Sequence, residues 1–169
     1  MRRRLFTGLL SVLGLAPQAQ AAPTDVPAQP IQQQMSDLKE TLSALAVQVG
    51  KESFSITLDY SEASIEKVEF ILGELHKEYA KTKREDGIRG LAAEFAAYII
   101  KVIEKHYEAG VWTRDHPSMG VGSFPYEWRG ATIFPASWCF KRIVDGVGDD
   151  VSVKYRVFVV EHARATKAD

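Results

Sequence analysis

Cysteine and histidine are both scarce in this chain of 169 residues. Cys139 is the single cysteine, so the chain forms no internal disulfide and its fold must depend on a hydrophobic core. Four histidines are present, and none belongs to a His-x-x-x-His pair. A zinc site usually takes three or four ligands, two of them close in sequence. We therefore expect no metal site and no bound cofactor.

Neither sign of charge dominates the sequence. The formal net charge is −1, but residues 1–21 contain three arginines and no acidic residue, so 18 basic residues face 22 acidic ones in the remainder. A mildly acidic, mixed surface disfavours nucleic acid or an anionic membrane as the main partner. We expect neither to be bound.

No stretch reaches the ~20 consecutive apolar residues that span a bilayer. The apolar run from Leu5 to Ala16 follows three arginines and precedes Ala19-Gln20-Ala21. This order predicts a signal peptide over residues 1–21 that is cleaved on export to the periplasm; an ordinary amphipathic helix is the alternative. The arginines also fit a loose twin-arginine pattern, so both export routes stay open.

Residues 22–34 hold three prolines and four glutamines and are expected to form a spacer, followed by one globular domain over residues 35–169. Leucine and valine spacing predicts a helix over 36–49, and strict alternation predicts a strand over 53–58. Asp59 and Glu62 suggest a capping box for the next helix. Residues 88–107 are apolar nearly all round, which is typical of a central buried helix.

The second half of the domain contains shorter elements. Pieces at 110–113, 121–124 and 129–134 are predicted to form an antiparallel meander, and Pro135 and Gly146 bracket a short helix over 136–145. Residues 150–163 fit either a strand or a helix, and their alternation favours a strand. The whole pattern predicts a single α+β domain with three to four helices packed against a small antiparallel sheet.

A set of short motifs recurs in the order typical of one family: Leu58-Asp59-Tyr60-Ser61, Gly110-Val111-Trp112, Ile133-Phe134-Pro135, Lys141-Arg142-Ile143 and Asp149-Asp150. Over roughly residues 54–160 the chain resembles the DUF-3806 domain-of-unknown-function family of small bacterial proteins. The resemblance implies an α+β domain whose last segment is helical. It implies no reaction, and related small domains occur as immunity proteins beside bacterial toxins.

The segment over 112–129 is the candidate site. It combines aromatic, basic and acidic side chains with flexible glycines, and the candidate binding residues are Trp112, Arg114, Asp115, His116, Tyr126, Trp128 and Arg129. Aromatic residues and arginine dominate protein-binding hot spots. The alternative is that these aromatics simply cover the sheet. Ser-His-Asp catalysis would need a nucleophile elbow, and none is present. Cys139, between Trp138 and Phe140, is expected to be a core residue.

These patterns favour a non-enzymatic periplasmic protein that binds another protein, with an immunity protein against a toxin as one form of it. The alternative is a small periplasmic hydrolase or ligand-binding protein that uses Asp115, His116 and Arg129. Convergence of these three side chains in one polar pocket would favour the alternative. A flat aromatic patch with mobile loops in the 112–129 segment would favour the first hypothesis.

Overall fold

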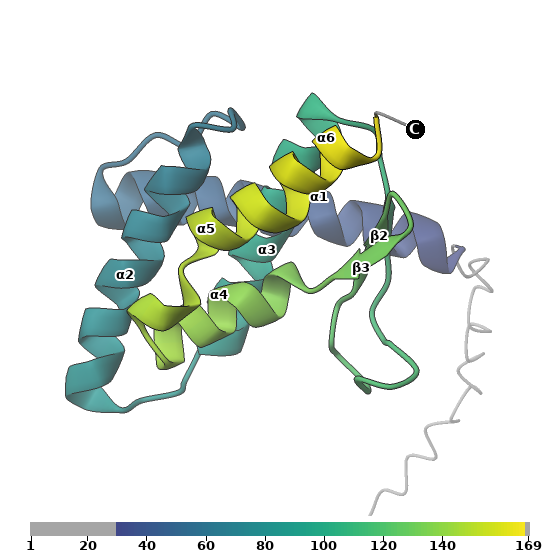
Figure 1. Cartoon of the computed structure of the whole chain (residues 1–169). Helices are drawn as coiled ribbons and strands as arrows, with labels where there is room; N and C mark the ends of the chain where they lie inside the picture. Colours follow the sequence, from purple (N-terminus) through teal and green to yellow (C-terminus); the bar gives the residue numbers. More distant parts are fainter. Residues whose placement is uncertain (1–29, 168–169) are drawn as a thin grey trace, which may run out of the picture.

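Helix α3 (Ile88–His106) packs against both α1 (Ile31–Phe54) and α4 (Pro135–Val144) in the computed structural model, which describes residues 30–167 (Figure 1). Ten of its residues are buried, as expected for a helix that is apolar nearly all round. α2 (Ser64–Thr82) packs on α4. The predicted signal peptide and the spacer up to residue 29 lie outside the described residues.

Helix α1 is longer than predicted at both ends. It includes residues 31–34, which were expected to belong to the spacer, and it runs past Gly50. A Cβ on Gly50 would lie 3.2 Å from the Ile56 carbonyl oxygen and 3.3 Å from the Leu58 side chain. Gly50 therefore allows the chain to fold back closely over the helix, and the helix ends at Ser55, which adopts a left-handed conformation.

The strand predicted over 53–58 was wrong. Residues 53 and 54 are the last of α1, and residues 55–59 belong to no helix or strand and have no strand partner among residues 30–167. Leu58 is buried and Ile56 is partly buried, so the alternation reflects a segment that packs on the core rather than a strand in a sheet.

The capping box at Asp59 and Glu62 was also wrong. Asp59 accepts hydrogen bonds from the backbone N–H and hydroxyl of Ser61, and the Ser61 hydroxyl in turn accepts from the N–H of Ser64 (3.2 Å), the first residue of α2. Glu62 Oε1 accepts instead from the hydroxyls of Tyr107 (2.7 Å) and Tyr155 (3.2 Å). The glutamate thus joins three segments and is not free to reach back to the helix start.

The sheet is antiparallel and has the order β1 (Val111–Trp112), β2 (Tyr126–Trp128), β3 (Ala131–Ile133). The strand predicted over 121–124 was wrong, because those residues belong to the long loop between β1 and β2. Gly122 and Phe124 both have a positive φ there, which a regular strand does not allow. The helix predicted over 136–145 was confirmed as α4, with Pro135 in its first turn.

The C-terminal segment is one continuous helix, as the resemblance to the DUF-3806 family implied, whereas the alternation that favoured a strand was misleading. α5 (Val151–Tyr155) runs into the π-helical turn η2 (Arg156–Glu161) and then α6 (His162–Ala165), after the short 3₁₀ turn η1 (Val147–Asp149). Its buried residues are Val151, Tyr155, Val159 and Ala163. In an α-helix with 3.6 residues per turn, side chains spaced four apart drift steadily around the helix. The π-helical turn contains more residues per turn, which corrects this drift and keeps the four buried residues on one face.

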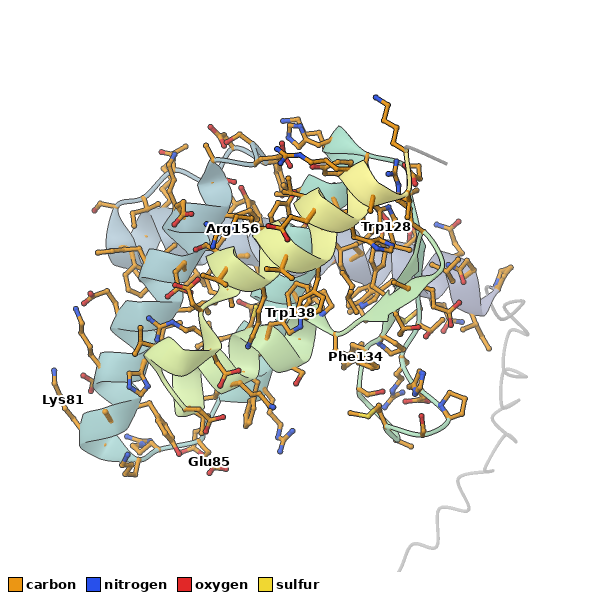
Figure 2. All side chains as sticks on the ribbon, viewed as in Figure 1. Lys81, Glu85, Trp128, Phe134, Trp138 and Arg156 are labelled. Atoms are coloured by element: carbon orange, nitrogen blue, oxygen red, sulfur yellow. The ribbon has the colours of Figure 1, made fainter. Side chains whose placement is uncertain are left out.

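Residues 30–167 thus form an α+β fold with five helices, one or two more than expected, and a small antiparallel sheet. Figure 2 shows Trp138 beneath the C-terminal helix and Trp128 at the sheet. The Trp138 ring stacks on Phe158, with ring centroids 5.7 Å apart. None of the helices within this range is long and apolar enough to cross a membrane.

Candidate functional site

The three aromatic residues of the candidate site are buried in the core. Trp112, Tyr126 and Trp128 are each at most 3% exposed. Trp128 Nε1 donates to the Glu108 carbonyl (3.0 Å), and the Tyr126 hydroxyl accepts from the N–H of Gly110 (2.8 Å). The sheet therefore presents these rings inwards, where they hold the α3–β1 connection, and they do not form an exposed aromatic patch.

Asp115 and His116 lie in the β1–β2 loop and stabilise its shape. Asp115 Oδ1 accepts from the N–H of Gly122 (2.7 Å), and His116 Nδ1 lies 3.1 Å from the hydroxyl of Ser118. His116 and Gly120 also exchange two backbone hydrogen bonds. A catalytic triad needs its carboxylate on the second nitrogen of the histidine. Because Asp115 binds Gly122 instead, no such triad forms in this loop.

Arg129 lies at the other end of the hairpin, in the β2–β3 turn. Its guanidinium forms an ion pair with Glu108 and donates to the Ala163 carbonyl (2.8 Å), which ties the sheet to the end of α6. The pairing lowers the pKa of the Glu108 carboxyl. Arg114 is exposed near the start of the loop, and its carbonyl accepts from the Phe124 N–H (3.0 Å). Arg129 therefore does not converge with Asp115 and His116.

An apolar groove of about 520 Å³ separates the β1–β2 loop from α3 and α4. Its lining residues are Arg89, Ala92, Ala93, Met119, Val121, Gly122, Ser123, Phe124, Phe134, Ala136, Ser137 and Phe140. The lining includes alanines from both helices and three phenylalanines. The loop that forms one wall projects away from the helices at the lower right of Figure 1.

Two residues of this wall are strongly exposed. Met119 is 62% exposed and Val121 is 82% exposed. Sequence reasoning missed both, because Val121 was assigned to a strand and Met119 was counted only as part of a flexible loop. The signal that could have found them is a pair of large apolar side chains among the glycines at 120 and 122, where no core position is expected.

Among the described residues that line the groove, Arg89 is the only charged one, and its guanidinium lies 5.0 Å from the centroid of the Phe140 ring. None of these described lining residues is a histidine, a cysteine or an acidic residue. Across residues 30–167 no three histidine, cysteine, aspartate or glutamate side chains are grouped to hold a metal ion. The groove is thus suited to hydrophobic contact.

Cys139 lies on α4 and is buried in the hydrophobic core, as the sequence indicated. Burial raises the pKa of its thiol well above its usual range.

We expect a thiol reagent to modify Cys139 about 1,000-fold more slowly in the native chain than in the urea-unfolded chain. The reason is that the reaction requires opening of a domain stabilised by several kcal/mol. The measurement is the rate at which Cys139 reacts with Ellman's reagent at pH 8. Comparable rates in both states would place the thiol at the surface.

Comparisons of the chain with known protein families, with curated proteins and with solved structures all give no match.

Proposed function

We propose that this chain is a non-enzymatic binding module of the bacterial envelope that binds another protein through the β1–β2 loop and the adjacent groove. The observation that carries the proposal is the exposure of Met119 and Val121 directly beside a groove walled by three phenylalanines. Exposed apolar surface next to an apolar hollow is typical of protein interaction sites. Burying it would contribute roughly 25 cal/mol per Å² of apolar area.

The proposed binding surface differs from the one that the sequence indicated within the same segment. The aromatics of the candidate site support the loop from beneath, while the side chains offered to a partner are Met119, Val121 and the groove rings. Arg114 and His116 flank this surface and would form part of its polar rim. The separation of Asp115 and His116 from Arg129 argues against the hydrolase alternative.

The form of this function that we favour is an immunity protein that binds a bacterial toxin in the periplasm. The support is the resemblance to the DUF-3806 family, whose related domains occur beside toxins, and the signal-peptide pattern of residues 1–21. Such a protein needs a binding surface and no catalytic group. The described lining of the groove supplies an apolar binding surface and contains no histidine, cysteine or carboxylate.

The proposal predicts that Met119→Ser/Val121→Ser reduces recovery of a protein partner from periplasmic extract by at least about tenfold, since two truncated hot-spot residues cost more than 1 kcal/mol each. The measurement is a pull-down with the exported chain, in cells that also express a toxin from a neighbouring gene. Both side chains are exposed, so the fold should be unchanged.

Val153→Ser is the matched control, because Val153 is also an exposed valine but lies on α5, away from the groove. It should recover the same partner as the unaltered chain. If the loop variant recovers as much partner as the unaltered chain, the interface lies on another surface. Recovery of no partner with the toxin present would exclude the immunity function.

A further inference from the structure

A second hollow, of about 370 Å³, lies between α2 and the corner that joins α4 to α5. It is lined by Glu69, Phe70, Gly73, Glu74, His76, Lys77, Arg142 and Val147, and it shares no residue with the groove described above. Its volume falls within the range of small-molecule sites, about 300–1,000 Å³.

Arg142 is the central group of this hollow and is only 7% exposed. Its Nε donates to Glu69 Oε1 (2.5 Å), and Glu69 Oε2 accepts from the backbone N–H of Val151 (2.9 Å). Both oxygens of the glutamate are therefore engaged. The guanidinium is held in place through a single one of its five N–H donors.

The remaining donors of Arg142 have no acceptor among the described residues. Nη1 is buried without a hydrogen-bond partner. Nη2 lies against Gly73 in the hollow wall, 2.7 Å from the position that a Cβ on Gly73 would occupy. Buried polar groups in proteins are nearly always hydrogen-bonded, so a buried arginine with its outer edge unpaired at a hollow needs an explanation.

Gly73 gives independent support for a built site. Glycine in the middle of a helix is unfavourable relative to alanine, and Gly73 is in the interior of α2. Its φ is not in the left-handed region, so the backbone does not require glycine. A Cβ here would meet only Nη2 and Cζ of Arg142, so an alanine would push the end of the guanidinium away from its present position at the hollow.

The other walls define the ligand. Phe70 and Val147 are exposed apolar side chains, and Lys77 is paired with Glu74 at the rim (2.5 Å). His76 Nδ1 donates to the Ile143 carbonyl (2.8 Å), which fixes the ring at the α4–α5 corner. Two cations therefore balance two carboxylates, and a multiply charged anion gains no net attraction.

We propose that this hollow binds a small organic carboxylate, with one carboxylate oxygen on the free Nη2 of Arg142 and its apolar body against Phe70 and Val147. A guanidinium N–H donates a short, charge-assisted hydrogen bond to a carboxylate oxygen. This site lies outside the proposed protein interface and does not depend on it.

The experiment is a titration of the isotope-labelled full-length chain by NMR, with 4-methylpentanoate as the probe and with acetate and inorganic phosphate as comparisons at constant ionic strength. We expect saturable shifts of the Gly73 and Val147 amides, tightest for 4-methylpentanoate. Gly73→Ala should weaken this binding by about tenfold or more, because its methyl group displaces the charged donor. Gly90→Ala, also within a helix but with nothing within 4 Å of its Cβ, should leave the affinity unchanged.

Phe70→Ala is a second variant that does not disturb the buried ion pair. It should weaken 4-methylpentanoate binding and leave acetate binding unchanged. The proposal is overturned if no probe gives saturable shifts, if Gly73→Ala binds as well as the unaltered chain, or if phosphate binds more tightly than the branched carboxylate.

Discussion

Glu69→Ala is expected to lower the free energy of unfolding by about 3–5 kcal/mol, because it leaves the guanidinium of Arg142 buried without its counter-charge. The Glu69 and Arg142 side chains are only 12% and 9% exposed, so solvent screens this pair little. The substitution also removes the acceptor of the Val151 N–H at the start of α5. The measurement is urea unfolding followed by circular dichroism.

Two further variants separate the lost ion pair from other effects. Glu66→Ala removes an exposed glutamate of the same helix and should change stability by less than about 0.5 kcal/mol. Glu69→Leu/Arg142→Met replaces both charges with apolar groups, and it should recover most of the loss because a buried pair contributes little net stability over well-packed hydrophobic residues. A loss below about 1 kcal/mol for Glu69→Ala would mean that Arg142 reaches solvent.

The helices that sequence patterns predicted correctly are those whose signals do not depend on distant contacts. Residues 88–107 are apolar nearly all round, which is typical of a central helix, and the structure has α3 there. Pro135 and Gly146 are local start and stop signals for α4, and they act through backbone geometry alone. Such signals need no knowledge of the neighbouring elements.

The C-terminal segment shows why alternation can mislead. Apolar residues occupy 151, 153, 155, 157 and 159, so they follow a spacing of two and a spacing of four at once. Burial follows the spacing of four: Val151, Tyr155 and Val159 are buried, whereas Val153 and Val157 are exposed. The sequence could not decide between these readings, because the choice depends on what α2 and α4 offer to pack against.

For a similar reason, the sequence did not predict which way the side chains of the candidate segment 112–129 point. Tyr126 and Trp128 lie two apart on β2, so they share one face, and Glu127 between them is exposed. Which face of β2 meets the core depends on how α3 and α6 pack against the sheet. In the structure, the face with the aromatic side chains is the buried one. The exposed apolar residues are found in the loop instead, where no periodicity applies.

The second large effect is expected at Gly110, where alanine should lower the free energy of unfolding by about 3 kcal/mol. A Cβ at this position would overlap the backbone carbonyl oxygen of Glu127 and would lie 2.8 Å from Cζ of the buried Tyr126 ring. A strand backbone and a buried ring cannot shift as an exposed side chain can. The Gly110 N–H would also lose its hydrogen bond to the Tyr126 hydroxyl.

Gly90→Ala is the matched control for this prediction, because nothing lies within 4 Å of its added methyl group and the residue is within α3. It should raise the free energy of unfolding by about 0.5–1 kcal/mol through helix propensity. Urea unfolding followed by tryptophan fluorescence gives both values, since Trp112 and Trp128 lie in the affected sheet. Glycine-to-alanine substitution is thus expected to lower the free energy of unfolding at position 110 and to raise it at position 90. If Gly110→Ala were neutral, the α3–β1 connection could not pass as closely over β2 as the structure places it, and the buried aromatics would lose the contact that turns them inwards.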